Sequence, residues 1–178
     1  MLASSWLIRA ETPADLPEIE TLQAEAFGPG RFARTAFRLR EGVAHDPRLS
    51  FVGMSGDALA GSVWLTPITI GTAPSLLLGP LTVAPAFKNR GLGRLLVAHV
   101  IKTAQALGER SVLLVGDAPY YARFGFSSER TGALAMPGPY EPHRFLALEL
   151  KAGALKGANG VLRPSGRRAE PIRRKLAA

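Results

Sequence analysis

The sequence predicts one α/β domain built on a mixed, mainly antiparallel sheet of six to seven strands, with about four helices packed against it. Two apolar segments, residues 49–54 and 58–70, flank the polar turn at 55–57, which is typical of an antiparallel hairpin. A helix-length segment separates two further apolar runs, 76–83 and 111–115, and a strand–helix–strand order places its strands parallel and adjacent. This parallel pair should lie at the centre of the sheet.

The composition is that of a folded domain without a disulfide framework. The 178 residues are 47% hydrophobic and 20% charged and include no cysteine, so the chain can bury a core without cross-links and offers no thiolate nucleophile. No apolar run approaches the roughly 20 residues that span a bilayer. Residues 1–8 lack the basic start and the cleavage site of a secretory signal. We therefore expect a cytoplasmic protein with no membrane contact.

The first helix has recognisable start and stop signals. After a short strand at residues 7–10, Thr12 supplies an N-cap, Pro13 the first helical position and Asp15 the acid three residues after the cap. Apolar residues then recur every three or four positions, which predicts one buried face. These residues are Leu16, Ile19, Leu22 and Ala26. The helix should end at residues 28–30, Gly-Pro-Gly.

A second helix is expected over residues 31–41. Its spacing places Arg31, Arg34 and Arg38 on one face, apart from the apolar positions. This basic face is either solvated or in contact with an anionic substrate or the phosphate of a cofactor.

The basic, glycine-containing turn at residues 88–94 carries the strongest functional signal. An apolar strand precedes it, and an apolar-rich helix follows over residues 91–107. A strand, a short turn and a helix N-terminus in this order present free backbone N–H groups to an anion. Gly91 and Gly93 let a ligand approach the backbone closely. We therefore expect a phosphorylated cofactor, although the turn has neither a P-loop nor a complete dinucleotide fingerprint.

Two motifs then identify a family. Residues 88–93, Lys-Asn-Arg-Gly-Leu-Gly, resemble the Arg/Gln-x-x-Gly-x-Gly/Ala signature with which the GNAT superfamily of N-acyltransferases binds acetyl-CoA. Residues 121–126, Tyr-Ala-Arg-Phe-Gly-Phe, resemble its second signature, Tyr-x-x-x-Gly-Phe, and they follow the next strand as in that family. The likeness extends over about residues 7–150. The wider segment Leu-Val-Gly-Asp-x-x-Tyr-Tyr-x-Arg-Phe-Gly-Phe is similar to a widespread, poorly characterised bacterial branch.

The resemblance implies where acetyl-CoA would bind. In the family, the pantetheine arm lies in a wedge where the fourth and fifth strands splay apart, and it pairs with the fourth strand's backbone. Because Pro80 has no N–H group, the Leu81 N–H is the candidate donor to the thioester carbonyl. The pyrophosphate would contact the N–H groups of the turn. The expected cofactor-binding residues are Leu81, Thr82, Val83, Lys88, Asn89, Arg90, Gly91, Leu92, Gly93, Arg94, Tyr121 and Phe124.

The resemblance also implies direct transfer of the acetyl group to an amine in a ternary complex. Tyr121 matches the family's tyrosine acid, which protonates the leaving thiolate; the alternative is a packing tyrosine beside Phe124 and Phe126. Since Tyr120 is adjacent, and roughly 100° away on a helix, only one of the two rings should face the wedge.

The sequence departs from the family pattern at two places. Lys88 replaces the usual Arg or Gln, which should matter little because backbone groups bind most of the phosphate. Gly116 and Asp117 stand where many members carry an Asn that contacts the cofactor. Asp117 is either the N-cap of the next helix or a third catalytic residue, as general base or ammonium anchor. Glu25 and Glu41 are further candidates for the base.

The acceptor amine is not specified by the sequence. Small amines, antibiotics, peptide N-termini and protein lysines all stay open, and the groove at residues 27–42 would select among them. No histidine pair has metal-ligand spacing, so we expect no metal, and His99 should be a partly buried helix residue. The protein should be a monomer or a homodimer.

The C-terminal part lies outside the resemblance. Residues 151–162 should form a peripheral extension with a hairpin, and residues 163–178 a basic, flexible tail. Six basic residues against the acid Glu170 give this tail a charge of +5 out of the total of +8. The tail is either solvated or an arm for nucleic acid or the ribosome, which would allow a non-catalytic, CoA-sensing or RNA-binding module instead of an enzyme. The six are Arg163, Arg167, Arg168, Arg173, Arg174 and Lys175.

Overall fold

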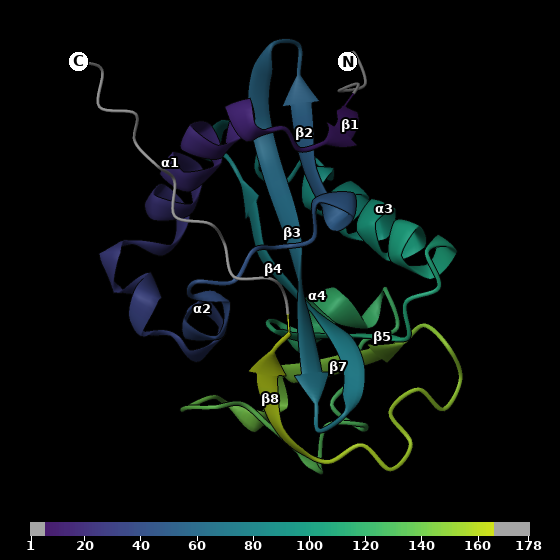
Figure 1. The fold of residues 1–178 in the computed structure, drawn as a ribbon. Coiled ribbons are helices and arrows are strands. Elements are labelled where there is room, and N and C mark those ends of the chain that lie inside the picture. The colour runs from purple at the N-terminus through teal and green to yellow at the C-terminus, as the bar shows by residue number, and fades with distance from the viewer. Residues whose placement is uncertain (1–5, 166–178) are drawn as a thin grey trace, which may run out of the picture.

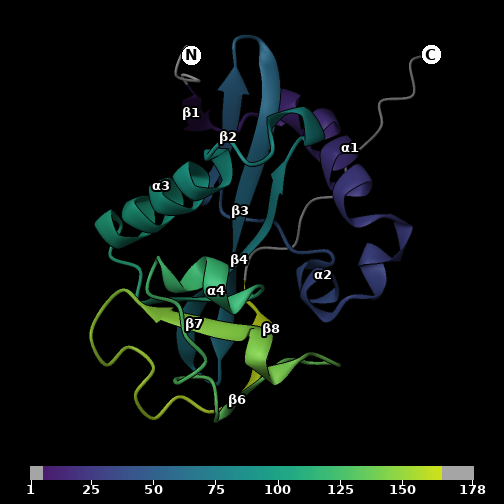
Figure 2. The same cartoon turned by 180° about the vertical axis from the view of Figure 1, so that it is seen from behind.

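The fold, taken from a computed structural model that describes residues 6–165, is a mixed sheet covered by helices on both faces (Figure 1 and Figure 2). The main strands lie in the order β1-β2-β3-β4-β5-β7. The strands are β1 (Leu7–Ala10), β2 (Ser50–Ser55), β3 (Ala58–Ile70), β4 (Ala73–Val83), β5 (Ser111–Val115), β6 (Leu134–Ala135), β7 (Phe145–Glu149) and β8 (Gly160–Pro164). The helices are α1 (Leu16–Phe27), α2 (Thr35–Arg40), α3 (Leu92–Ala106) and α4 (Ala118–Ala122).

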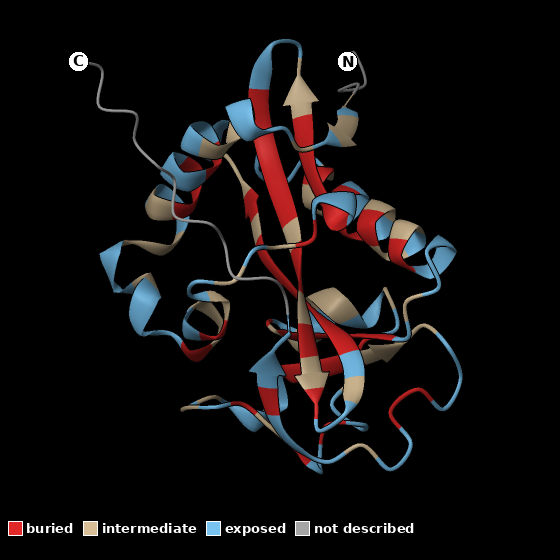
Figure 3. Cartoon of the chain, in the orientation of Figure 1, coloured by how far each residue is buried: buried red, intermediate tan, exposed pale blue. Residues whose placement is uncertain are grey.

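The alternation of side chains along the strands divides the core into two layers. Phe51 of β2 packs in the cluster that contains the inner face of α3, whereas its neighbour Val52 packs with Ile19 and Leu22 of α1. Successive residues of a strand point to opposite faces, so α1 and α3 cover opposite faces of the sheet. Buried positions accordingly follow the strands, while the outer sides of both helices are exposed (Figure 3).

The predicted parallel pair is present, and it is short. β4 pairs with β5 only at Leu76–Val112 and Leu77–Leu113, and every other pairing of the six main strands is antiparallel. Beyond Leu77 the two strands separate. A register shift in the β3–β4 ladder follows directly, so that Gly79 and Pro80 fall outside the regular pairing with β3. This is the splayed centre that the resemblance implied.

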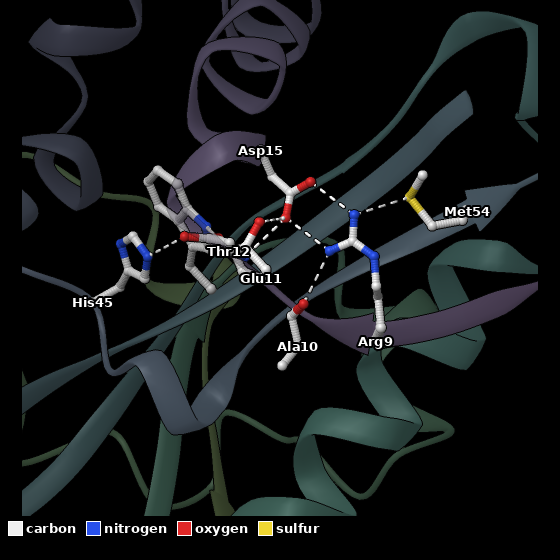
Figure 4. Close-up of polar contacts among 8 residues, drawn as sticks. Arg9, Ala10, Glu11, Thr12, Asp15, His45 and Met54 are labelled. Carbon is white, nitrogen blue, oxygen red and sulfur yellow. Dashed lines mark hydrogen bonds and ion pairs between the residues drawn. The ribbon is translucent and has the colours of Figure 1, made fainter. Parts of the chain in front are cut away.

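The start of α1 agrees with its predicted signals. Thr12 and Asp15 form a capping box, in which the Thr12 N–H donates to the Asp15 carboxylate at 2.7 Å, and a 3-10 turn, Pro13–Asp15, leads into the helix. The guanidinium of Arg9 donates to both oxygens of Asp15 at 2.8 Å (Figure 4). Next to this pair, Glu11 accepts hydrogen bonds from His45 and Trp64. β1, α1 and β3 are thereby tied together at one end of the sheet.

The prediction of one helix over residues 31–41 is wrong. A 3-10 helix, Pro29–Ala33, precedes an extended Arg34 with ψ 135°, and α2 begins only at Thr35. The Thr35 hydroxyl donates to the carbonyl of Pro139 at 2.5 Å, which fixes the start of α2 against a distant loop. The expected continuous basic face therefore does not form. Arg31 instead lies over the ring of Phe32, 4.2 Å from its centroid.

The expected peripheral hairpin after residue 150 is also not observed. Turns at residues 151–157 lead to the single strand β8, which pairs antiparallel with β3 and parallel with β6. Leu162 of β8 is fully buried at 0% exposure, so this segment completes the core. Arg163 belongs to β8. The other basic residues of the predicted tail, and its predicted flexibility, lie outside the described residues.

Candidate active site

A cavity of about 740 Å³ opens where β4 and β5 separate, within the size range of small-molecule sites. Its wall comes from the α2 region, residues 78–81 of β4, the segment from β5 into α4, and the loop at 139–144. In Figures 1 and 2, α2 and α4 approach β4 from opposite sides. All three residues predicted to be catalytic, Leu81, Asp117 and Tyr121, line this one cavity.

The predicted anion-binding turn has the backbone geometry that such a site requires. Gly91 is the N-cap of α3 with φ 88°, a left-handed conformation that favours glycine, and Asn89 also has a positive φ of 60°. The first helical hydrogen bond runs from the Leu95 N–H to the Gly91 carbonyl, so the N–H groups before Leu95 have no partner within the helix. Lys88, Asn89 and Arg94 are exposed around it, and the first turn carries no acid.

An aromatic contact that the sequence did not indicate holds this turn in place. The Trp6 indole N–H donates to the Arg90 carbonyl at 3.3 Å, and the Arg90 guanidinium lies 5.4 Å from the Trp6 ring. The Trp6 ring meets that of Phe87 edge-on at 5.7 Å. Arg90 is thus fixed against aromatic rings, and no local motif could have revealed a contact that spans 84 residues.

Leu92 and Gly93 have different environments. The Leu92 side chain is a core anchor: a Cβ on Gly53 would stand 2.5 Å from it and one on Gly61 3.2 Å. Only the backbone of Leu92 is therefore available to a ligand. At Gly93 a Cβ would stand 2.9 Å from the Tyr120 hydroxyl and 3.6 Å from the Val83 side chain. Gly93 therefore permits the close approach of α3, the end of β4 and α4.

The residues of β4 that were predicted to bind the cofactor also differ in their environments. Leu81 lines the cavity, whereas the Thr82 side chain is buried and its hydroxyl pairs with that of Ser62 at 2.9 Å. Only the backbone of Thr82 can therefore take part in binding.

Tyr121 lies against the floor of the cavity and is largely enclosed. A Cβ on Gly116 would stand 2.5 Å from its ring, and Phe126 packs edge-on at 5.8 Å. Burial raises the pKa of Tyr121 well above its ordinary value, Tyr120 and Asp117 raise it further, and Arg40 opposes the shift. Its hydroxyl has no hydrogen-bond partner among residues 6–165, so a protonated phenol faces the cavity.

The expectation that only one of the two adjacent tyrosines faces the wedge is wrong. Tyr120 lines the same cavity, with its ring edge-on to Tyr121 at 4.9 Å. Burial raises the pKa of Tyr120, against the opposing effect of Arg123 and Arg94. Phe124 does not line the cavity and instead supports both rings, at 6.0 Å from Tyr120 and 6.5 Å from Tyr121.

Comparison with known proteins decides the family. The sequence model of the acetyltransferase (GNAT) family matches residues 16–126, which is more than half of the chain. This chain belongs to the GNAT family. It is therefore an acetyltransferase, in a family whose acyl donor is acetyl-CoA.

The named relatives are bacterial GNAT proteins. The uncharacterised N-acetyltransferase YhbS of Escherichia coli K12 is 28% identical over 158 residues, which are 88% of this chain and 94% of YhbS. YjhQ of the same strain is 30% identical over 131 residues, 71% of this chain and 72% of YjhQ. The crystal structure of E. coli YhbS in complex with CoA has a TM-score of 0.76 at 26% identity, covering 92% and 91% of the two chains. A GNAT acetyltransferase of Brucella melitensis in complex with acetyl-CoA has a TM-score of 0.57 at 28% identity, covering 82% and 96%.

The departure from the GNAT pattern at Gly116 and Asp117 has a structural reason. The absence of a side chain at Gly116 makes room for the Tyr121 ring. The Asp117 carboxylate accepts the Tyr120 N–H at 3.1 Å and so caps α4, while it also lines the cavity. The other base candidates, Glu25 and Glu41, do not line it, whereas Glu141, which the sequence did not single out, does.

The sequence analysis also missed Arg40, the last residue of α2. Its Nη2 donates to the Leu78 carbonyl at 3.5 Å, and its Nε is inaccessible to solvent and has no partner. Burial lowers the pKa of Arg40 to about 9, so the guanidinium is charged at neutral pH. Arg40 lines the cavity beside Leu78 and Tyr121. Its position beside a buried leucine in a short helix gave no sequence signal for this role.

The described residues contain no group of histidine or acidic side chains that could hold a metal ion. His99 is half-buried and packs edge-on against Phe51 at 4.5 Å. Within residues 6–165, none of the helices is both long and apolar enough to cross a membrane.

Proposed function

We propose that this protein transfers the acetyl group of acetyl-CoA directly to a primary amine within a ternary complex. The observation that carries the proposal is that Leu81 and a protonated, partly buried Tyr121 line one cavity at the point where β4 and β5 separate. The absence of cysteine leaves no thiolate for an acyl-enzyme, which favours a direct route.

The binding of acetyl-CoA would use the C-terminal end of β4 and the turn that follows it. Backbone N–H groups of residues 88–94 hold the pyrophosphate at the N-terminus of α3, where the helix dipole favours negative charge. Beyond Leu77 the edge of β4 that faces β5 has no strand partner, so residues 81–83 can pair with the pantetheine amides. The exposed basic side chains at the turn and the complexes of YhbS and the Brucella protein support this arrangement.

The chemistry then falls to three groups. The Leu81 N–H donates to the thioester oxygen as negative charge develops on it. A neutral amine forms the new C–N bond while the C–S bond breaks, and Tyr121 gives its proton to the departing sulfur. Asp117 attracts the acceptor's ammonium and takes the proton that the amine loses, directly or through water.

Cofactor binding is tested with Arg94→Glu. An acid in the first turn of α3 favours the helix itself but repels a pyrophosphate, so stability without ligand should hold while stabilisation by CoA falls. The matched control is Lys102→Glu, an exposed lysine further along the same helix, which should keep the full shift. If CoA raises the melting temperature of neither wild type nor control, the proposed function fails.

Turnover is tested by release of free CoA with a panel of amines. Tyr121→Phe should lower kcat by about 10²-fold or more, the range for losing a general acid, and should leave CoA affinity nearly unchanged. An unchanged kcat would remove Tyr121 from the mechanism without affecting the family assignment.

A further inference from the structure

We propose that the Arg40 guanidinium binds an anionic group of the acceptor, so that the acceptor is an amine that also carries a carboxylate. This inference rests on the proposed function and adds the substrate class to it. Its basis is the position of Arg40 in the cavity, its unfilled hydrogen-bonding capacity and the absence of a counter-charge.

Arg40 is held by the ring of Phe37, whose centroid lies 5.4 Å from Cζ, and by weak polar contacts. Its Nη2 lies 3.5 Å from the Leu78 carbonyl, longer than an ordinary N–H···O bond. A Cβ on Gly79 would stand 2.8 Å from the same nitrogen, so the glycine makes room for the guanidinium at the point where β4 leaves β5. Within the described part of the chain, Nη1 has no partner, and unlike Nε it is not sealed from solvent.

Within residues 6–165 the charge of Arg40 has the ring of Phe37 beside it but no carboxylate partner. Among the arginines of the described chain, Arg9 pairs with Asp15 and Arg48 with Asp46, and no such ion pair involves Arg40. A partly buried guanidinium without a carboxylate partner is costly to the fold. A carboxylate is the group that best offsets this cost, since it can accept two parallel N–H hydrogen bonds from the planar guanidinium.

The anion must come from the acceptor because the cofactor's charges lie elsewhere. The phosphates belong at residues 88–94, none of which lines the cavity. The pantetheine arm and the acetyl group that would enter the cavity are uncharged. The cavity also carries the carboxylates of Asp117 and Glu141, so it offers both signs of charge to an acceptor that has an ammonium and a carboxylate.

The first test uses unreactive probes on the full-length protein saturated with CoA. Butyrate and 3-phenylpropionate are compared by calorimetry with their neutral primary amides, butyramide and 3-phenylpropionamide. We expect the carboxylates to bind at least tenfold more tightly in wild type, and Arg40→Gln to remove this preference. Arg38→Gln is the matched control: it makes the same charge change on the same helix, at a residue outside this cavity. Equal binding of acid and amide in wild type, or an unchanged preference in Arg40→Gln, overturns the proposal.

The second test compares the turnover of matched acceptors. Each pair consists of an amino acid and the amine that has the same side chain but lacks the carboxylate. Arg40→Gln should raise KM for the carboxylated member about tenfold and leave the decarboxylated member nearly unchanged. An equal loss for both members, or a wild-type preference for the decarboxylated amine, contradicts the inference. Thermal stabilisation by CoA, measured on the same samples, reports separately on the proposed function. Arg40→Lys keeps the charge but loses the planar guanidinium, so its preference for the carboxylated acceptor should be intermediate.

Discussion

The hydroxyl oxygen of Tyr120 lies 2.9 Å from the position that a Cβ on Gly93 would occupy. This contact joins the first turn of α3, which carries the N–H groups proposed to bind the pyrophosphate, to α4, which carries Tyr121. The two ends of the candidate site are therefore in direct contact although Gly93 and Tyr120 are 27 positions apart in the chain.

Gly93→Ala should weaken cofactor binding with only a small loss of stability. The new methyl group must displace Tyr120, and overpacking of this kind costs about 1–3 kcal/mol. Since 1.4 kcal/mol is a tenfold change in an equilibrium, KM for acetyl-CoA should rise about tenfold. Alanine favours the helix by about 1 kcal/mol over glycine, which offsets part of the overpacking cost, so the melting temperature should fall by only a few degrees. Adding Tyr120→Phe removes the clashing oxygen and should restore most of the affinity; if the double variant is no better, the contact is not the cause.

Gly116→Ala should lower kcat with little effect on CoA affinity. A Cβ at this position would stand 2.5 Å from the Tyr121 ring and must move the phenol out of place. Misplacement of a reacting group by about 1 Å can cost about 10²-fold in rate. Gly132→Ala is the control, because nothing lies within 4 Å of its Cβ. Equal rates for the two variants would contradict a role for the Tyr121 position.

The pH dependence of kcat should show no loss of the acid below pH 10. Burial raises the pKa of Tyr121 above its ordinary value near 10, so the phenol stays protonated through the neutral and mildly alkaline range. The rate should rise with pH as the acceptor amine loses its proton. A steady-state profile from pH 6 to 10 tests this. If the rate of the wild type fell with rising pH already below pH 9 and that of Tyr121→Phe did not, Tyr121 would lose its proton in this range and the prediction would be wrong.

Asp15→Asn should destabilise the fold by about 2 kcal/mol at neutral pH, the range for a hydrogen bond to a charged group. The hydrogen bonds from Arg9 hold the pKa of Asp15 far below its usual value, and those from Thr12 add to the effect. A carboxylate whose pKa is lower in the folded state adds stability above about pH 4, and that stability is lost as the pH falls further. Denaturant unfolding at pH 7 and pH 3 should therefore show a difference between wild type and variant that shrinks in acid. Asp57→Asn, in the exposed β2–β3 turn, should show no such difference at either pH.

Local patterns predicted most of the fold, because strands, turns and caps depend on neighbouring residues. The β2–β3 hairpin, the capping box at Thr12 and the helix that follows Gly91 all lie where the sequence placed them. The break before α2 could not be predicted in this way. Thr35 is fixed by Pro139, a contact over 104 residues that leaves no trace in the 3.6-residue periodicity.

The candidate site could likewise be predicted only where local sequence motifs mark its residues. The two family motifs indicated the turn at residues 88–94 and Tyr121, and the roles of both stay predictions. Leu81 and Asp117, which the sequence also indicated, line the same cavity as Tyr121. Arg40 and Glu141 were missed because each reaches the cavity from an element far away in sequence. The burial of Leu162 was missed for a related reason: its partner strand β3 lies about 90 residues earlier, and its own glycine-rich surroundings resemble a surface loop.

The short β4–β5 pairing gives the molecule a sheet edge in its interior. From Leu78 onward, the side of β4 that faces β5 presents main-chain groups with no strand beside them. An unpaired edge is a template for other chains, and native proteins cover such edges. An extended ligand that hydrogen-bonds along β4 covers this edge much as an added peptide strand would. If the acyl donor pairs along β4 as proposed, its binding also covers this edge, and we expect the ligand-free form to aggregate more readily than the loaded one.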